Sequence, residues 1–547
     1  MNYISILGLF TLLGAAWLLS YHRTDVKLRP ILWGISLQLL FALIILREDI
    51  GSFIGMCILG SLIITYLMRG NEAPQKSIGY FVVAIFINSL LIWLINNSIA
   101  LSANFPSFIF VFVIILFSIN YFLKIDPSLQ KYFISVLLLS GISLLILNDL
   151  HGKVIVEIFS TKVKSFLGLS DWGAKFLFGN LADENFFGAW NDKFPNKGTW
   201  PGFGFQFGFK VLPTIIFFGG FMSVLYYLGI MQKVIQSISR FMRWTIGTSG
   251  AETLSCSANI FVGQTEAPLL IKPFLNNMTK SELLTVMVGG FATIAGGVLA
   301  GYIAMGVPAG HLIAASVMSA PAALVIGKII FPEKEHSQTA GDLELPDIQV
   351  GSNAIEAASN GITDGLKLAV NVGAMLIGFI ALIAVIDVLL NWLDSIIDGS
   401  LLNGIYLAYD SSGLSPVNGE FSGYFPGSLR TLFGTILSPL AFLMGVPWED
   451  AGHVGNLLGI KLSLNEFVAF GTLGDYINSG MLSERGIIIS TYALCGFANF
   501  SSIGIQIGGI SALAPSRKGD LAKVGLKAMF GGAIASWLTA TIAGIFI

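Results

Sequence analysis

The sequence predicts an all-α integral membrane protein of about 12 transmembrane helices plus two re-entrant helical hairpins in an inverted repeat. Two features of the composition carry this prediction: 54% of the 547 residues are hydrophobic and only 11% are charged, whereas soluble chains carry about 25% charged residues. A third observation is that two apolar regions are interrupted midway by polar residues, Gly and Pro. The 30 basic and 32 acidic residues nearly balance, which argues against a nucleic-acid partner.

The N-terminal part of the chain contains apolar stretches of the length that crosses a bilayer, about 20 residues each. Basic residues follow the first, third and fifth stretch, and loops rich in Lys and Arg face the cytoplasm. The N-terminus is therefore expected outside. We divide this part into two spans at residues 1–49 and four additional spans at 50–149. The stretches start near Tyr3, Pro30, Ile50, Ile78, Phe105 and Phe133.

Residues 150–208 begin with an amphipathic stretch between Val154 and Lys164 and continue into a Gly-rich and aromatic-rich part. Such a segment is expected to lie along the outer membrane interface. The polar composition of residues 332–364 predicts a cytoplasmic loop. The other predicted segments are 209–331, with a span near Val211, the first hairpin (about 248–276), a broken helix and a span; 365–428, with a long helix and an outer loop; and 429–547, with the second hairpin (about 429–470), a second broken helix and the last span.

Both hairpins are predicted where polar residues interrupt an apolar stretch. Residues 259–268 place Asn, Gln, Thr and Glu between apolar flanks that are too short to cross a bilayer. In the second region, the bend-forming residues 445–447 are followed by Asn465 and Glu466. An acidic residue at membrane depth costs about 2.5–3.5 kcal/mol. Glu266 and Glu466 therefore favour a binding role, although hairpin tips that reach water are the alternative.

Each hairpin precedes a helix that is interrupted by polar residues. The interruptions are similar in sequence, with Gly-Phe-Ala-Thr at 290–293 and Gly-Phe-Ala-Asn at 496–499. Three spans are expected between the two units, so the repeat should be inverted, and inverted repeats with broken helices indicate a transporter site near the midplane. Helix–helix contacts within the membrane are the alternative role for Asn499, Ser501 and Ser502.

Three motifs carry a close resemblance to the concentrative nucleoside transporter family. They are Gly-Gln-Thr-Glu-Ala-Pro at 263–268, Asn-Glu-Phe at 465–467 and Gly-Phe-Ala-Asn-Phe-Ser-Ser at 496–502. The resemblance extends from about Val211 to Ile547. It implies a homotrimer in a bacterial-type plasma membrane, with a scaffold that includes the long helix around Leu366–Trp392 and a mobile transport domain built from both hairpins and both broken helices. Motion would resemble an elevator.

The resemblance also implies sodium-coupled symport of nucleosides such as uridine, and no enzymatic activity. Asn499, Ser502 and Glu466 would hold the ribose, because a carboxylate accepts hydrogen bonds from ribose hydroxyls. The base would contact Gln264, Thr265, Glu266 and Val298, with Phe497 nearby. The complete set of positions that the resemblance assigns to the nucleoside is Gly263, Gln264, Thr265, Glu266, Val298, Glu466, Phe497, Asn499 and Ser502.

The resemblance favours sodium as the coupling ion, because proton-coupled relatives differ at the positions of Asn259 and Thr293, and no cofactor is expected. Sodium is a hard cation that prefers oxygen ligands. Family positions carry over to the side chains of Asn259 and Thr293 and to the backbone carbonyls of Val262 and Ile294.

Three alternatives remain open. Proton-coupled nucleoside symport would require Glu266, Glu466 or His453 to titrate. An intramembrane enzyme acting on a lipid or nucleotide headgroup is disfavoured, because the sequence offers no metal-ligand motif or nucleophile–base pair, and the three cysteines lack such spacing. A channel is disfavoured because paired hairpins in a repeat suit alternating access better than a continuous pore.

Overall fold

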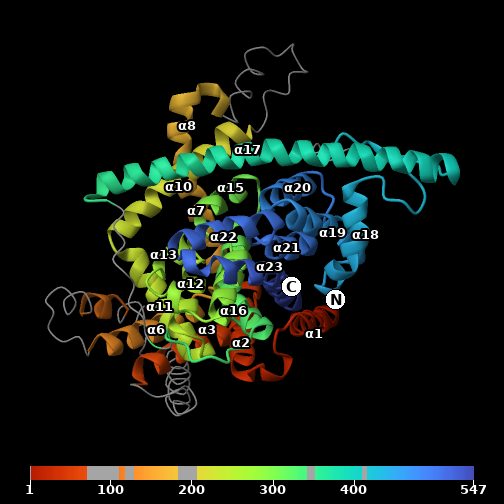
Figure 1. Ribbon diagram of the computed structural model, residues 1–547. Helices are drawn as coiled ribbons and strands as arrows, with labels where there is room; N and C mark the ends of the chain where they lie inside the picture. Colours follow the sequence, from red (N-terminus) through yellow and green to blue (C-terminus); the bar gives the residue numbers. More distant parts are fainter. Residues whose placement is uncertain are drawn as a thin grey trace.

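The computed structural model describes residues 2–69, 110–116, 129–182, 206–339, 341, 351–409 and 415–547. These residues are predominantly helical, as predicted. Figure 1 shows one long helix across the upper part of the molecule, with most of the other helices below it in that view. The strands β1 (Tyr406–Ala408) and β2 (Gly419–Phe421) form an antiparallel ribbon in which Leu407 pairs with Glu420.

The N-terminal helices begin close to the predicted starts of spans. They are α1 (Asn2–Leu18), α2 (Leu28–Leu46), α3 (Ile50–Met68) and α6 (Gln130–Leu147). The spans predicted near Ile78 and Phe105 lie largely outside the described residues. Within the described residues, eight helices are long and apolar enough to cross a membrane. The total of about 12 spans therefore stays a prediction.

Four helices, with an unexpected bend between the last two, lead to the central part of the fold. The predicted amphipathic segment forms α7 (Gly152–Leu167), and α8 (Ser170–Phe178) follows it. The span predicted near Val211 is α10 (Phe207–Tyr227). Gly229, with φ of 70°, separates α10 from α11 (Ile230–Ile246). The sequence interpretation missed α11 as a separate helix.

The long helix α17 (Ala354–Asp394) has 41 residues and continues as a π-helix over Ser395–Leu401. It begins where the side chain of Asn353 accepts a hydrogen bond from the backbone N–H of Glu356. Residues 354–364, which were predicted to lie in a polar loop, are therefore helical. The error arose because the first turns of α17 are polar, although helices extend beyond apolar segments wherever an N-cap allows.

The first unit comprises a hairpin, a broken helix and one further helix. It consists of α12 (Gly250–Ala258), a turn, α13 (Ala267–Leu270), the broken helix α14 (Lys280–Ala292) and α15 (Gly296–Ala304), and then α16 (Ala309–Ile330). Ser249 with Glu252 and Thr279 with Glu282 form capping boxes that start α12 and α14. These caps satisfy N–H groups that have no partner within their own helix.

The second unit repeats this order after α18 (Leu429–Leu443). It contains α19 (Trp448–Ser463), α20 (Glu466–Asn478), the broken helix α21 (Glu484–Leu494) and α22 (Phe500–Leu513), and the last helix α23 (Lys518–Phe546).

The boundaries of the second hairpin differ from the sequence-based range. The bend at 444–447 turns the chain by 116° between α18 and α19, whereas Glu466 is the first residue of α20, directly after the next turn. The hairpin that presents Glu466 therefore occupies residues 448–478 rather than about 429–470. Gly445, with φ of 98°, and Pro447 form the earlier bend. In the sequence this bend is as conspicuous as the turn before Glu466.

The sequence similarity between the two breaks does not mark equivalent positions. Residues 290–292 form the last turn of α14, whereas residues 496–498 lie within the break between α21 and α22. The structural repeat lies in the order of elements instead. The local sequence identity was misleading. Both breaks use residue types that occur where backbone N–H and C=O groups lack partners within a helix.

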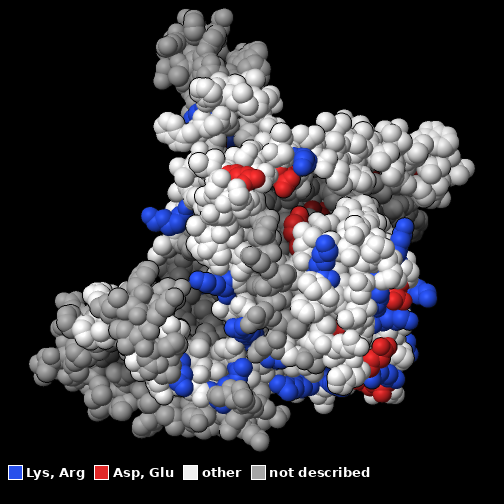
Figure 2. All heavy atoms as spheres, turned by 60° about the vertical axis from the view of Figure 1, so that its left-hand side comes forward, with Lys and Arg blue, Asp and Glu red and all other residues white. Residues whose placement is uncertain are grey.

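The surface agrees with a membrane protein. Figure 2 shows that most of the described part of the visible face carries neither acidic nor basic side chains. Exposed large apolar residues on α17 include Ile377, Val385 and Trp392. Such a surface is suited to lipid or to another protein rather than to water.

The pairing of α17 with α10 depends on glycine. A Cβ atom added at Gly365 would lie 2.9 Å from Ile216 Cα, whereas one added at Gly378 would meet no heavy atom within 4 Å. We expect Gly365→Ala to lower the free energy of unfolding by about 1–3 kcal/mol because overpacking forces the helices apart. Gly378→Ala is the matched control and should not destabilise the protein. Thermal unfolding in detergent measures the stability of both variants. Equal unfolding midpoints for Gly365→Ala and Gly378→Ala would show that the close contact at Gly365 does not require glycine.

Candidate functional site

A cavity of about 380 Å³ lies where the turns of both hairpins and the breaks of both broken helices face α17. All residues predicted to bind the nucleoside are on its wall. The lining residues are Gly263, Gln264, Thr265, Glu266, Ala295, Val298, Leu368, Asn371, Val372, Met375, Leu376, Asn465, Glu466, Phe467, Phe497, Asn499, Ser501, Ser502 and Ile505.

Glu466 is the most enclosed carboxylate of this wall, with 3% of the residue exposed. Its Oε1 accepts a hydrogen bond from the Tyr302 hydroxyl at 3.1 Å, and its Oε2 accepts one from Asn499 Nδ2 at 3.3 Å. Tyr302 is fully buried and stacks on Phe470 with ring centroids 4.4 Å apart. A carboxylate offers about four acceptor positions, so Glu466 retains capacity for donors from a ligand. It also lies in the first turn of α20, where the helix dipole favours negative charge.

Asn499 is fixed in one orientation by three contacts. Its Oδ1 accepts hydrogen bonds from the backbone N–H of Ser502 at 2.9 Å and from Ser501 Oγ at 2.7 Å. These contacts cap the start of α22. The Nδ2 group therefore points at Glu466, and the second hairpin is joined to the second broken helix.

A second chain of hydrogen bonds joins the first hairpin to the same helix. Gln264 Nε2 donates to Ser502 Oγ at 3.3 Å, and Gln506 Nε2 donates to Gln264 Oε1 at 3.0 Å and to the Met287 carbonyl at 3.2 Å. The cavity wall is thus one connected polar network across both units. Gln506 was missed by the sequence interpretation, although a Gln within an apolar helix was a usable signal.

The two acidic residues predicted for the site differ in environment. Glu266 lines the cavity but is exposed, whereas Glu466 is buried. A Cβ atom at Gly263 would meet the end of the Glu266 side chain, which would have to shift. The Glu266 carboxylate therefore faces the cavity, whereas the Glu466 carboxylate is held inside the cavity wall.

The two segments that carry the positions predicted for sodium are in contact. The turn after α12 contacts the first break, because the Gly296 N–H donates to the Phe261 carbonyl at 3.1 Å. Asn259 is 1% exposed, and within the described part of the chain neither its Oδ1 nor its Nδ2 has a hydrogen-bond partner. Thr293 Oγ1 donates to the Gly289 carbonyl at 2.8 Å, which leaves its lone pairs free.

The oxygen atoms of these residues fit a hard cation. A buried amide without partners costs about 1–3 kcal/mol, and an ion that binds the Asn259 oxygen would relieve part of that cost. Ile294, whose carbonyl is the fourth predicted ligand beside that of Val262, is fully buried in the same break.

The sequence interpretation missed the opposite wall of the cavity. Leu368, Asn371, Val372, Met375 and Leu376 of α17 form it. Asn371, a polar residue in an apolar stretch, was the one signal in the sequence. Nothing in the sequence alone indicated which face of α17 would meet the hairpins.

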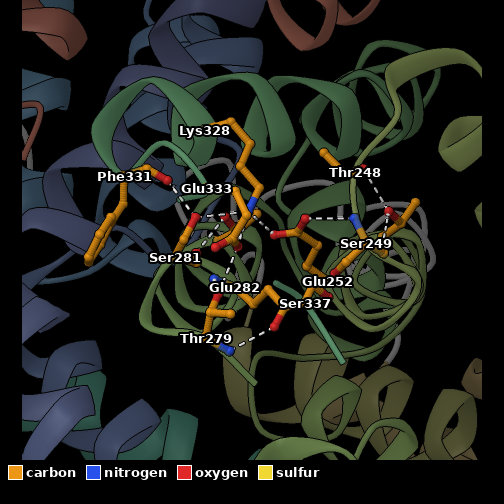
Figure 3. A network of polar contacts seen from close by, with 12 residues as sticks. Thr248, Ser249, Glu252, Thr279, Ser281, Glu282, Lys328, Phe331, Glu333 and Ser337 are labelled. Atoms are coloured by element: carbon orange, nitrogen blue, oxygen red, sulfur yellow. Dashed lines mark hydrogen bonds and ion pairs between the residues drawn. The ribbon is translucent and has the colours of Figure 1, made fainter. Parts of the chain in front are cut away.

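A separate polar cluster lies at the opposite ends of α12 and α14 (Figure 3). Lys328 Nζ lies 2.7 Å from a Glu252 carboxylate oxygen and donates to Ser281 Oγ at 2.9 Å. Glu282 accepts a hydrogen bond from Ser337 Oγ at 2.6 Å. None of these residues lines the large cavity. The cluster fixes the first hairpin arm and the broken helix to each other.

Comparisons with known proteins agree with this geometry. Sequence profiles described as Na+ dependent nucleoside transporter C-terminus, nucleoside recognition and Na+ dependent nucleoside transporter N-terminus match residues 311–544, 208–309 and 7–68. An uncharacterised transporter of Haemophilus influenzae is 45% identical over 411 residues, which cover 74% of this chain and 89% of that protein. Sodium/nucleoside cotransporter 2 of Mus musculus is 41% identical, over 70% of this chain and 54% of that protein.

A solved structure is similar over the whole chain. It is described as CNTnw in an inward-facing substrate-bound state, and it aligns with a TM-score of 0.66 at 31% identity, covering 100% of this chain and 98% of that chain.

The bond from Tyr302 to Glu466 is testable through stability. We expect Tyr302→Phe to lower the free energy of unfolding by about 1.5–3 kcal/mol, as for hydrogen bonds to charged groups. Tyr492→Phe is the matched control, because Tyr492 is also fully buried but its hydroxyl has no partner among the described residues. Denaturation of both variants in detergent checks this expectation. A Tyr302→Phe protein as stable as the Tyr492→Phe protein would show that the hydroxyl does not hold Glu466.

Proposed function

Because the chain belongs to the concentrative, Na+-dependent nucleoside transporter family, we propose that it carries nucleosides such as uridine into the cell together with sodium. As a member of this family it is a multi-pass membrane transporter rather than an enzyme. The observation that carries the proposal is the cavity in which a buried Glu466 keeps free acceptor positions beside the amides of Gln264 and Asn499.

A nucleoside matches the chemistry of this wall. Glu466, Asn499 and Ser502 would take the ribose, because its adjacent hydroxyls are donors for the carboxylate. The base would lie against Gln264, Thr265, Glu266 and Val298. Phe497 would then cover it, and Gly263 would keep room for the Glu266 side chain. A neutral ligand with several donors fits this mixture of one buried carboxylate, amides and hydroxyls.

Sodium would bind between the first hairpin and the first break. Asn259 and Thr293 would supply side-chain oxygens, and Val262 and Ile294 would supply backbone carbonyls. The unpartnered, buried amide of Asn259 supports this assignment. One sodium ion that moves inward down 100 mV provides about 2.3 kcal/mol, which corresponds to a nucleoside gradient of roughly 40-fold.

The movement would be of the elevator type. Both hairpins and both broken helices form one side of the cavity, and α17 forms the other. The helices joined by the polar network would move as one transport domain along a scaffold that includes α17 and assembles as a homotrimer. The exposed apolar face of α17 supports a contact with another copy of the chain.

Uptake into proteoliposomes tests the substrate and the ion together. We expect saturable uridine uptake that disappears when choline replaces sodium. Glu466→Gln and Asn499→Ala should each lower uptake by about tenfold or more, because each removes a partner from a buried charged network. Glu157→Gln, which changes an exposed carboxylate on α7, is the control. Uptake that persists without sodium but stops when a pH gradient is dissipated would favour proton coupling instead.

The sodium ligands are tested separately through ion affinity. Asn259→Ala should raise the sodium concentration that gives half-maximal uptake by about tenfold, because one oxygen ligand is lost. Asn478→Ala, at an exposed position of α20, should leave it unchanged. An unaltered sodium dependence in Asn259→Ala would exclude this residue as a ligand.

A further inference from the structure

Two helix C-termini meet inside the protein beside the cavity. The second break packs against the end of α14, because a Cβ atom added at Gly496 would lie 2.6 Å from the Phe291 carbonyl oxygen and 2.9 Å from that of Ala292. Gly496 has φ of 134°, so a glycine is required there. The C-terminus of a helix carries about half a negative elementary charge. Two such ends together present roughly one negative charge, far from water, that a cation would stabilise.

The first unit offers a neutral side chain at this place. Asn259 follows the last residue of α12 and lies against Gly289, in the last turns of α14. Both polar atoms of its side chain are buried without partners in the described part of the structure. The C-terminal end of α14 thus meets the unpaired amide of Asn259 and, among the described contacts, no fixed positive charge. A mobile cation fits this end.

The second unit places a lysine at the corresponding point. Lys461, in the last turn of α19, is 0% exposed. Its Nζ donates to the Ala493 carbonyl at 2.9 Å, in the last turn of α21. In both units, therefore, a polar side chain from the end of the first hairpin arm faces the end of the first half of the broken helix. The second unit differs because its side chain is itself a cation.

Lys461 is not paired as other buried lysines are. Lys328 is also buried, but it contacts the carboxylates of Glu252 and Glu333 (Figure 3). Within the described residues, Lys461 makes no ion pair with a carboxylate. Glu466, five residues later in the sequence, instead uses its oxygens for Tyr302 and Asn499. A buried ammonium without a hydrogen-bonded carboxylate is strongly unfavourable unless another negative potential holds it. Here the nearby Glu466 carboxylate attracts it through space, and the helix C-termini add their negative potential.

We propose that the Lys461 ammonium is a fixed cation that occupies, in the second unit, the position that sodium takes in the first, so that the protein couples one sodium ion to each nucleoside. This inference rests on the proposed function. One fixed and one mobile positive charge then serve the two negative helix ends. The place where a second sodium would bind is filled permanently by the side chain.

The gradient that sodium sustains tests the stoichiometry in the unaltered protein. Proteoliposomes are held at zero membrane voltage with a tenfold inward sodium gradient, and the limiting uridine gradient is measured. One sodium per nucleoside predicts an accumulation of about tenfold, whereas two predict about a hundredfold. The hundredfold result would overturn the inference and leave sodium-coupled transport intact. Uridine accumulation that does not depend on the sodium gradient would overturn the proposed function and this inference with it.

Substitution of Lys461 provides a second test. It should increase the affinity for sodium, whereas a general loss of structure would decrease it. Lys461→Met removes a positive charge near the sodium site, so the sodium concentration for half-maximal uridine binding should fall by about tenfold. Lys461→Arg keeps the charge and should remain close to the unaltered protein.

Lys328→Met is the matched control, because it also removes a buried lysine. It should not increase the affinity for sodium. A half-maximal sodium concentration in Lys461→Met that is unchanged or higher would contradict the inference. If Lys461→Met does not fold, the gradient measurement decides alone.

Discussion

Helix ends inside a bilayer must find partners for their backbone N–H and C=O groups within the protein, and this requirement shapes the whole centre of the molecule. The starts of α20 and α22 are capped by Asn465 and Asn499. The first break is joined to the first hairpin by the bond from Gly296 to Phe261. The end of α21 is held by Lys461. Two of these partners, Asn465 and Asn499, also line the cavity, so the same side chains complete helix ends and shape the candidate site.

Much of this centre is predictable from the sequence, because interruptions of apolar segments have few structural solutions. Polar residues and Gly within short apolar flanks indicated the first hairpin, and the structure has its turn between α12 and α13. Interruptions were also predicted at 290–293 and 496–499, and the structure breaks these helices at 293–295 and 495–499. The motifs at 263–268, 465–467 and 496–502 all contribute residues to the cavity wall. Their role as ligands of nucleoside and sodium stays a prediction.

Other features depend on packing that one sequence does not reveal. Leu368, Val372 and Leu376 look like any apolar residues of a long helix, and only the approach of the hairpins makes them a wall. Tyr302 reaches Glu466 from the first unit across a large separation in sequence. The second hairpin was placed too early, because the bend before Trp448 carries the same Gly and Pro signals as a re-entrant turn. The polar first turns of α17 were mistaken for a loop, because composition alone does not show that Asn353 caps a helix there.

Shared contacts link the proposed ion and substrate. The first hairpin turn carries Asn259 on one side and Gln264 on the other, and Gln506 ties Gln264 to α14, whose end faces the ion position. A sodium ion at Asn259 would therefore fix the turn that presents Gln264 to a nucleoside. The most direct test is an experimental structure determined with uridine and sodium. The account predicts ligand density between Glu466 and Gln264 and an ion beside Asn259 and Thr293. Uridine bound elsewhere, or an ion remote from the first break, would contradict it.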